Sequence, residues 1–173
     1  MILSDKDIRD YIDKKQLFIE PLSGDTVREN GVDLRVGDEL LRFIYNKEPI
    51  DINDKSVLEK AYNKEKIDGN FVIFPQERVL IKIGEKIKMP NTLIGLCNIR
   101  STFARLGLAI PPTIVDAGYE GNLTIMMIGG NIPVRISKGT RFLHLVFSTT
   151  LSEVQKPYSG GYNQSSTVTG AKI

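Results

Sequence analysis

Cysteine, histidine and tryptophan are almost absent from this sequence. It contains one cysteine, Cys97, one histidine, His144, and no tryptophan. One cysteine cannot form an internal disulfide, and one cysteine with one histidine cannot complete a Cys/His zinc site. These counts exclude a fold stabilised by internal disulfides and a nucleotide deaminase of the zinc-dependent kind.

Long apolar runs and an excess of one charge are absent as well. No stretch approaches the ~20 apolar residues of a membrane-spanning helix, and the start, MILSDKDIRD, is too charged for a signal peptide. The 23 Lys and Arg residues against 21 Asp and Glu leave a formal net charge of +2, which is too small to predict wrapping by nucleic acid. We therefore expect a cytoplasmic protein that binds neither membranes nor nucleic acid.

The composition that remains is that of an ordinary globular domain. The 173 residues are 41% hydrophobic and 25% charged, and a chain of this length is most simply one domain with its own core. Ser4 begins a capping box, and apolar residues at helical spacing follow it. This pattern predicts a short N-terminal helix that ends near Lys15.

Beyond this helix the pattern is that of short strands. Residues 32–36 alternate apolar and charged side chains, which predicts a half-buried strand. Residues 45–70 are polar, and we expect them to run over the surface between two strands, with a short helix around Val57–Tyr62. We expect little catalytic or binding chemistry in this segment. Further β-rich runs lie at residues 71–74, 78–83, 92–97, 123–128, 134–136 and 141–147. Such runs separated by turn residues predict an antiparallel sandwich, barrel or jelly roll.

The end of the chain differs from the rest in composition. Residues 157–173 are rich in glycine, serine and threonine, and they hold too few apolar residues to bury. We therefore predict a single β domain over residues 1–156 and a mobile tail over residues 157–173. A tail of this kind can serve as a lid.

Well-known catalytic motifs are missing, including the Walker loop, the dinucleotide fingerprint, GxSxG and HExxH. Candidate residues come instead from short polar segments between the predicted strands. Arg100, Ser101 and Thr102 follow an apolar strand and offer a guanidinium group and two hydroxyls to phosphate oxygens, and Arg105 adds a second charge. Taken alone, this segment is more simply a solvated turn.

A second short polar segment contains the carboxylate of Asp116. Asp116 directly follows the β-branched run 113–115, and Gly118 and Gly121 bracket Tyr119. A carboxylate fixed at a strand end could orient a water as a general base, whereas an Asx turn would explain the same residue. Tyr119 is either a core aromatic residue or a ring stacked on a sugar or base.

The remaining reactive side chains favour structural roles. His144 lies within an apolar strand, which favours a hydrogen-bonded structural histidine over a catalytic one. Cys97 lies between Leu96 and Asn98 and is most simply a buried small hydrophobe.

Three segments, taken in order, resemble the dUTPase superfamily, which includes the trimeric dUTP diphosphatases and the homologous dCTP deaminases. They are residues 1–8, 100–108 and 115–121. The first two resemble the deaminase branch, the third resembles dUTPases, and the similarity covers most of the chain. The resemblance implies a mostly β fold, a distorted jelly roll or β-barrel with a short N-terminal helix, assembled as a homotrimer.

The resemblance also implies how a nucleotide site is built. Each pocket is formed by neighbouring subunits and closed by a C-terminal tail, and Mg²⁺ binds with the triphosphate. By resemblance, Asp116 activates the attacking water, Tyr119 packs beneath deoxyribose, and Asp33 supports the metal through water. The residues implied to bind substrate are Arg100, Ser101, Thr102, Arg105, Tyr119, Arg141, Tyr162 and Gln164.

The sequence departs from the family pattern at two places. The deaminase reaction in the family uses a Glu ten positions after the equivalent of Asp116, and here that position is Met126. A thioether cannot shuttle protons to activate water at cytosine. The segment 108–115 is also shorter than in typical relatives, and Pro111 and Pro112 lack amide donors, which can alter a base preference read by the backbone.

These observations favour a dUTP diphosphatase that releases dUMP and pyrophosphate. Pyrophosphate cleavage requires a positioned water, cationic groups over the phosphates and a metal, all of which the sequence still offers. Two alternatives stay open: a dCTP deaminase whose proton shuttle comes from elsewhere, and a catalytically silent deoxynucleotide-binding protein.

Overall fold

The computed structural model describes residues 1–172, and its secondary structure is mostly β. The helices are α1 (Asp5–Asp13), α2 (Lys55–Leu58), the 3₁₀ helix η1 (Glu59–Ala61) and α3 (Ser101–Arg105). The strands are β1 (Phe18–Glu20), β2 (Val27–Arg28), β3 (Gly31–Phe43), β4 (Tyr62–Lys66), β5 (Asn70–Ile73), β6 (Arg78–Ile83), β7 (Lys86–Lys88), β8 (Leu93–Ile99), β9 (Thr113–Val115), β10 (Glu120–Gly121), β11 (Thr124–Ile128), β12 (Val134–Ser137) and β13 (Arg141–Thr149).

The N-terminal helix begins with the predicted capping box. The Ser4 hydroxyl accepts a hydrogen bond from the Asp7 amide at 3.3 Å, and the Asp7 carboxylate accepts one from the Ser4 amide at 3.1 Å. Ile8 is fully buried beneath the helix. The helix ends at Asp13 with Lys14 as its C-cap, which confirms the predicted end near Lys15, where the positive φ of 54° is incompatible with a right-handed helix.

One eight-stranded sheet carries most of the fold. Its main path runs β11–β6–β3–β13–β8–β9, with β2 and β4 also paired to β3. Strand β3 is 13 residues long and shifts register between Val36 and Leu40, and such an irregularity bends a strand. A three-stranded sheet, β1–β7–β10, and a two-stranded sheet, β12–β5, complete the structure.

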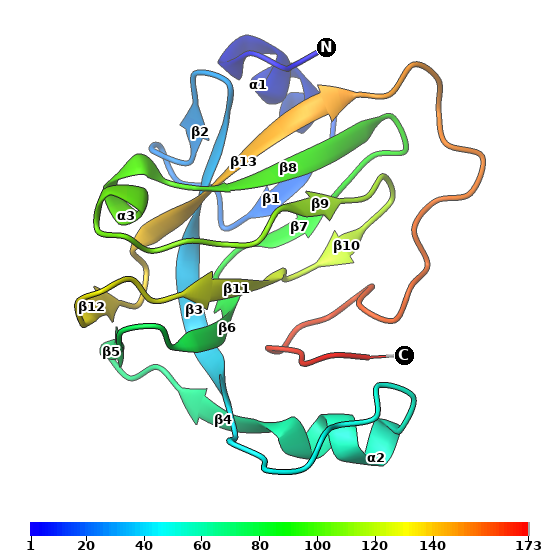
Figure 1. Cartoon of the computed structure of the whole chain (residues 1–173). Coiled ribbons are helices and arrows are strands. Elements are labelled where there is room, and N and C mark those ends of the chain that lie inside the picture. The colour runs from blue at the N-terminus through cyan, green and yellow to red at the C-terminus, as the bar shows by residue number, and fades with distance from the viewer. Residues whose placement is uncertain (173) are drawn as a thin grey trace.

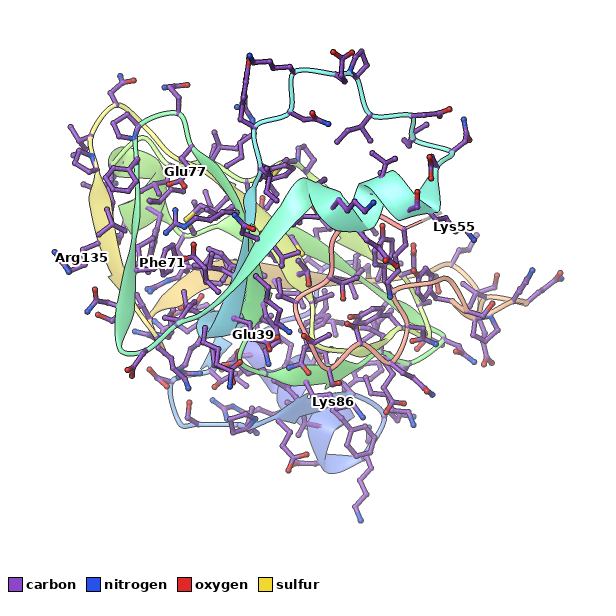
Figure 2. All side chains as sticks on the ribbon, turned by 90° about the horizontal axis from the view of Figure 1, so that it is seen from below. Glu39, Lys55, Phe71, Glu77, Lys86 and Arg135 are labelled. Atoms are coloured by element: carbon purple, nitrogen blue, oxygen red, sulfur yellow. The ribbon has the colours of Figure 1, made fainter. Side chains whose placement is uncertain are left out.

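The long strand β3 crosses the whole molecule, with α1 near one end and α2 near the other (Figure 1). The sheets curl around a core that includes the fully buried Phe142, Phe147 and Ile81. Figure 2 shows how densely side chains fill this interior, while the exposed Lys55 and Arg135 lie at the outside. All the named strand pairs are antiparallel, which confirms the predicted mostly β, barrel-like fold class.

Each of the six predicted β-rich runs from residue 71 onward contains a strand. The polar excursion is more ordered than expected, because residues 62–66 form β4 along the edge of β3. A short helical segment does precede it, at α2 and η1.

The C-terminal segment runs from the end of β13 past β10 and ends beside β4 and β6 (Figure 1). The sequence predicted that this segment has too little to bury, yet Val168 is 5% exposed. Its predicted mobility stays a prediction, and Ile173 lies outside the described residues. None of the helices in residues 1–172 is long and apolar enough to span a membrane.

Candidate functional site

Asp116 opens onto a cavity of about 510 Å³, here called the Asp116 cavity. The residue directly follows β9, and its carbonyl accepts a hydrogen bond from the Tyr119 amide at 3.2 Å, which closes a tight turn. Gly118 permits this turn with a φ of +84°. The Asp116 side chain is exposed, and it is the one acidic side chain among the described residues that line the cavity.

Tyr119 belongs to both the core and the cavity wall. Its side chain is 6% exposed, and its hydroxyl donates a hydrogen bond to the Asn122 carbonyl at 3.0 Å. Burial, together with the nearby Tyr158, raises the pKa of the Tyr119 hydroxyl, so this group stays neutral. The two tyrosine rings lie 5.9 Å apart at an angle of 51°. Tyr119 is therefore a core aromatic residue that also lines the cavity, and its contact with a sugar or base stays a prediction.

Met126 lies in the wall of the same cavity. Alternate residues of β11 face opposite sides of the strand: Ile125 and Met127 are buried in the core, whereas Met126 is half-buried and faces the cavity. The position at which the deaminase branch has its Glu thus faces Asp116 across a shared space. In this chain it contributes a thioether.

Aromatic rings form much of the remaining wall. The lining includes Phe43, Tyr62, Tyr119, Tyr158 and Tyr162. Phe43 and Tyr62 were missed by the sequence analysis, which expected little chemistry from residues 45–70 and so gave no weight to Tyr62. The available signal was an aromatic residue at the end of the predicted short helix, Val57–Tyr62.

The C-terminal segment closes one side of the Asp116 cavity. The Gln164 amide donates to the Glu120 carbonyl at 2.6 Å, and the Asn122 amide donates to the Ser165 carbonyl at 2.7 Å. Tyr162 lines the cavity, and the substrate contact that the resemblance implies for it stays a prediction. Gln164 does not line it: its side chain is exposed, and its backbone, with a φ of +57°, makes the contact.

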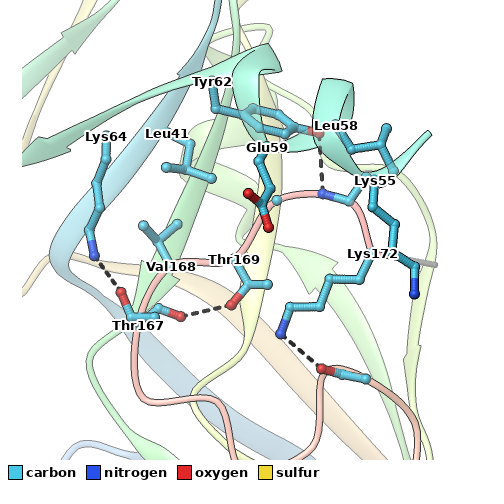
Figure 3. A pocket seen from close by; sticks show the side chains of 13 residues that line it. Leu41, Lys55, Leu58, Glu59, Tyr62, Lys64, Thr167, Val168, Thr169 and Lys172 are labelled. Atoms are coloured by element: carbon cyan, nitrogen blue, oxygen red, sulfur yellow. Dashed lines mark hydrogen bonds between the residues drawn. The ribbon is translucent and has the colours of Figure 1, made fainter. Parts of the chain in front are cut away.

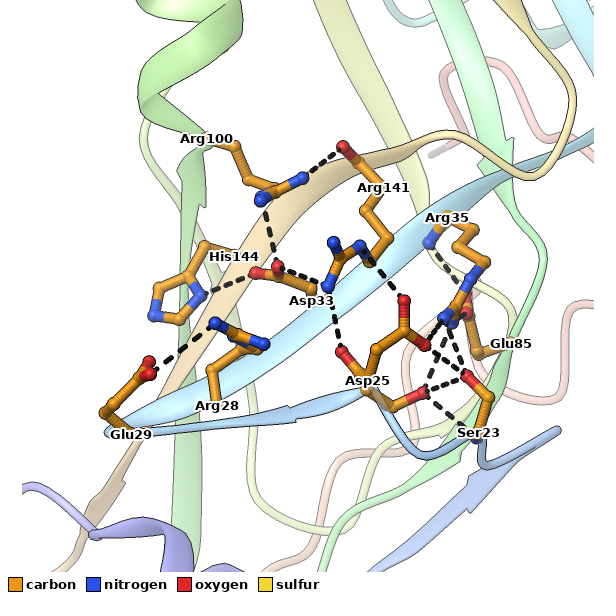
Figure 4. A network of polar contacts seen from close by, with 11 residues as sticks. Ser23, Asp25, Arg28, Glu29, Asp33, Arg35, Glu85, Arg100, Arg141 and His144 are labelled. Atoms are coloured by element: carbon orange, nitrogen blue, oxygen red, sulfur yellow. Dashed lines mark hydrogen bonds and ion pairs between the residues drawn. The ribbon is translucent and has the colours of Figure 1, made fainter.

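A second group of predicted residues surrounds Asp33 (Figure 4). Asp33 is 2% exposed. Its Oδ1 accepts from His144 Nδ1 at 2.9 Å, and its Oδ2 lies 3.0 Å from Arg100 Nε and 3.6 Å from Arg141 Nη1. These four residues are called the Asp33 cluster. The expectation of a hydrogen-bonded histidine at position 144 is confirmed.

The strand order explains why these residues meet. Strand β13 lies between β3 and β8, which places His144 beside Asp33 on one side and Asn98 on the other. Arg100 follows the end of β8, where its Nη1 donates to the Arg141 carbonyl at 3.1 Å. A Cβ on Gly31 would lie 2.6 Å from the Leu145 carbonyl oxygen and 2.8 Å from His144 Nε2, so the close approach of β13 requires glycine there.

A shallow cavity of about 330 Å³ lies over the Asp33 cluster and includes Ser101. Thr102 and Arg105 are exposed on α3 and do not line it. The cluster continues through Asp25, which pairs with both Arg35 and Arg141. Glu85, which the sequence analysis missed, is 1% exposed and accepts from Arg35 Nη1 at 2.9 Å.

The predicted site residues therefore form two groups on one chain. The lining of the Asp116 cavity and the lining of the cavity over the Asp33 cluster share no residue. The first group offers a carboxylate and aromatic walls, and the second offers guanidinium groups and a hydroxyl. Within a single chain, Asp116 and the side chains predicted to bind phosphate do not line a common cavity.

The described residues do not fit a metal held by the protein alone. No group of three or more His, Cys, Asp or Glu side chains within residues 1–172 is placed to hold a metal ion. Both carboxylate oxygens of Asp33 are already engaged by basic side chains. The remaining reactive group, Cys97, is buried, and burial raises its pKa to about 12, as befits a small hydrophobe.

The family can now be stated from comparison with known proteins. The family model described as dCTP deaminase-like matches residues 2–150. This chain belongs to the dCTP deaminase-like family. The resemblance drawn from residues 1–8, 100–108 and 115–121 is thereby confirmed.

The close relatives of this chain include a probable dUTP nucleotidohydrolase as well as dCTP deaminases. The "Probable deoxyuridine 5'-triphosphate nucleotidohydrolase" of Sulfolobus islandicus rod-shaped virus 1 is 51% identical over 172 residues, which cover 99% of each chain. The dCTP deaminase of Desulfurococcus amylolyticus is 50% identical and covers 100% of this chain and 96% of its own. That of Acidianus ambivalens is also 50% identical, with 100% and 98% covered.

Solved structures agree on the fold. The 2'-deoxycytidine 5'-triphosphate deaminase of Agrobacterium tumefaciens superposes with a TM-score of 0.67 at 20% identity, over 84% of this chain and 47% of that one. The dUTPase of Staphylococcus bacteriophage 80alpha, solved with dUpNHpp, has a TM-score of 0.51 at 20% identity, over 83% and 97%. At these identities the likeness establishes a shared fold.

Proposed function

We propose that this chain is a dUTP diphosphatase that hydrolyses dUTP to dUMP and pyrophosphate. The observation that carries the proposal is the composition of the Asp116 cavity: Asp116 is its one acidic side chain among the described residues, and Met126 faces the same space. A single carboxylate is enough to orient a water onto phosphorus. Deamination in the family uses in addition a Glu at the position of Met126, and this cavity lacks that carboxylate.

The roles of the cavity residues follow from their chemistry. Asp116 is exposed at the end of β9, so its carboxylate is free to accept a proton from an attacking water. Tyr119 presents a ring held from behind by the core and by Tyr158. Such a fixed ring beneath the sugar leaves no room for a 2′-hydroxyl and selects deoxyribose by steric exclusion.

A homotrimer would bring the two groups of residues together. The Asp33 cluster and Ser101 offer guanidinium groups and a hydroxyl, while the Asp116 cavity offers a carboxylate with aromatic walls and no arginine. We infer that one subunit's Arg100, Ser101, Thr102 and Arg105 face the Asp116 cavity of its neighbour. Phosphate oxygens held there would lie within reach of the water on Asp116.

Magnesium enters this proposal as part of the substrate. Phosphate oxygens are hard ligands for Mg²⁺, which keeps several waters and is usually held through substrate phosphates in such sites. Bound there, the metal neutralises charge on the triphosphate. Asp33 is implied to support it only through water, and in this chain Asp33 holds Arg100 and Arg141 in place.

Deamination of dCTP is the second candidate, because relatives 46–50% identical to this chain are named dCTP deaminases. It requires a proton shuttle at the base, which Met126 does not supply. The virus relative at 51% identity, named a probable dUTP nucleotidohydrolase, favours the first candidate.

One experiment separates these functions. The protein is incubated with dUTP, dCTP, dTTP and UTP in the presence of magnesium, and the mono-, di- and triphosphates of each base are separated. We expect dUMP and pyrophosphate from dUTP and no uracil nucleotides from dCTP. Uracil nucleotides formed from dCTP at a rate comparable to dUTP hydrolysis would move the protein to the deaminase branch. Nucleotide binding without any product would identify a silent binding protein.

A further inference from the structure

Tyr62 stands between two cavities. On one side lies the Asp116 cavity, and on the other lies a cavity of about 530 Å³ between α2, β4 and the C-terminal segment, here called the outer cavity. Residues 169–171 line both cavities, so this stretch of chain is the partition between them. Figure 3 shows the outer cavity with Tyr62 at its upper edge and the C-terminal segment crossing below it.

The partition rests on the Tyr62 ring. A Cβ built on Gly170 would lie 2.5 Å from Tyr62 Cε2 and 2.8 Å from Cδ2, so only glycine approaches the ring this closely. The Ala171 amide donates to the Tyr62 hydroxyl at 3.3 Å. Phe43 supports the ring in an edge-to-face contact, with the centroids 5.1 Å apart. Phe43 and the Ala171 amide therefore both hold the ring in the position where it meets Gly170.

The segment that leads into the partition is anchored to the sheet. The Glu39 carboxylate accepts from the Thr167 hydroxyl at 2.6 Å and from the Val168 amide at 2.9 Å. The Thr169 amide donates to the Thr124 hydroxyl at 3.0 Å. These contacts bring the chain to Tyr62 in a defined direction. Beyond Tyr62, Lys172 is held by Tyr162 and Gly161: its amide donates to the Tyr162 hydroxyl at 2.9 Å, and its Nζ donates to the Gly161 carbonyl at 2.9 Å.

We propose that Tyr62 is a positioning residue that holds Gly170 and Ala171 as a wall of the nucleotide site. The inference rests on the proposed function, because the nucleotide is taken to occupy the Asp116 cavity. Without the ring, the partition loses its support and the Asp116 cavity opens into the outer cavity. Water then reaches the bound nucleotide, and the wall no longer retains it.

Two single variants and their combination test this role. Gly170→Ala adds a methyl group against the fixed ring, and Tyr62→Ala removes the ring. Each is expected to speed amide hydrogen exchange of residues 165–172 and to raise the KM for dUTP by about tenfold, with a smaller change in kcat and an unchanged Tm. In the Tyr62→Ala background, Gly170→Ala is expected to add nothing, because the methyl group no longer meets a ring.

Two control variants separate the ring from other effects. Gly161→Ala lies in the same segment, but its added Cβ would be 3.7 Å from its nearest neighbour, Lys172 Cδ, and we expect wild-type exchange and KM. Tyr62→Phe keeps the ring but loses the hydrogen bond from the Ala171 amide, so we expect smaller increases in exchange and KM than in Tyr62→Ala. Equal increases in the two variants would assign the support to the hydroxyl instead of the ring.

The outcomes are distinct. Equal effects of Gly170→Ala in the wild-type and Tyr62→Ala backgrounds would overturn the proposal, as would unchanged exchange in Tyr62→Ala. Amide exchange is measured without nucleotide, so it reports on Tyr62 even if the wild-type protein hydrolyses no dUTP. Absence of dUTP hydrolysis by the wild-type protein would refute the proposed function. The support of the C-terminal segment by Tyr62 would then be decided by amide exchange alone.

Discussion

His144 Nδ1 lies 2.9 Å from Asp33 Oδ1, and the other oxygen of the same carboxylate meets Arg100 and Arg141. One carboxylate, 2% exposed, therefore keeps three basic side chains together at the junction of β3, β8 and β13. Without it, the two guanidinium groups would keep only the exposed carboxylate of Asp25, which pairs with Arg141 at 3.3 Å. Asp33 is thus the buried negative charge on which the geometry and stability of the Asp33 cluster depend.

Replacing Asp33 should accordingly destabilise the fold. We expect Asp33→Asn to lower the free energy of unfolding by about 2–4 kcal/mol, slightly below the usual cost of breaking a buried pair because the arginine side chains are partly exposed. Denaturant unfolding measures this value. Asp25→Asn is the matched control, since Asp25 pairs with the same Arg141 but its side chain is 51% exposed, and we expect a clearly smaller loss. Equal losses would show that Asp33 is not the centre of the cluster.

Asp116 should matter for turnover and little for binding. Asp116→Asn keeps the shape of the side chain and removes its basicity, so we expect dUTP to bind while kcat falls by about 10²–10⁴-fold, the usual contribution of a general base. Glu120→Gln provides the control, because Glu120 pairs with Lys86 at 2.6 Å and does not line the Asp116 cavity. Turnover of Asp116→Asn within about tenfold of wild type would exclude Asp116 as the base.

The longer apolar strands of this protein were predictable because such a strand leaves a local signature, whereas the polar β4 and the short β7 and β10 were not predicted. Each run of alternating or continuous apolar residues from residue 71 onward became a strand, and the Ser4 capping box became a helix start. Which strands are neighbours leaves no such signature. Asp33 and His144 are 111 positions apart, and they meet only because β13 lies between β3 and β8.

Only the part of the candidate site that is formed by residues close in sequence was predictable. Asp116, Tyr119 and Met126 lie close in sequence, and they line one cavity. Tyr62 was missed because its role comes from contact with Gly170, which is distant in sequence and belongs to a segment expected to have nothing to bury. The predicted residues lie at two separate cavities. Only the family resemblance implied this separation, because a local sequence pattern does not show which residues a neighbouring subunit contributes.

Acid should weaken the contact between β3 and the C-terminal segment. Burial opposes ionisation of Glu39, but hydrogen bonds from Lys64, Thr167 and the Val168 amide outweigh it and lower its pKa from 4.5 to about 2. A carboxyl group with a lowered pKa stabilises the fold fully above its unfolded-state pKa, and that contribution is lost as the pH falls through the folded-state pKa. The contribution of Glu39 is thus complete above pH 4.5 and disappears as the pH approaches 2.

The measurement is the free energy of unfolding of wild type and Glu39→Gln across this range of pH. We expect the difference between the two proteins to be constant at neutral pH and to shrink steadily between about pH 5 and about pH 2. A difference that stays the same down to the acid limit would mean that the ionised form of Glu39 does not hold Thr167 and Val168.

Tyr119 provides a test of sugar selection that separates the ring from its hydroxyl. Tyr119→Phe removes the hydrogen bond to the Asn122 carbonyl, which costs about 0.5–1.5 kcal/mol of stability, but it keeps the ring in the cavity wall. We expect this variant to discriminate between dUTP and UTP as wild type does. Tyr119→Ala removes the ring, and we expect the ratio of kcat/KM for dUTP over UTP to fall by at least about tenfold, because the space beneath the sugar then admits a 2′-hydroxyl. An unchanged ratio in Tyr119→Ala would place Tyr119 in the core alone, whereas a lost preference in Tyr119→Phe would mean that the hydroxyl, and not the ring, reads the sugar.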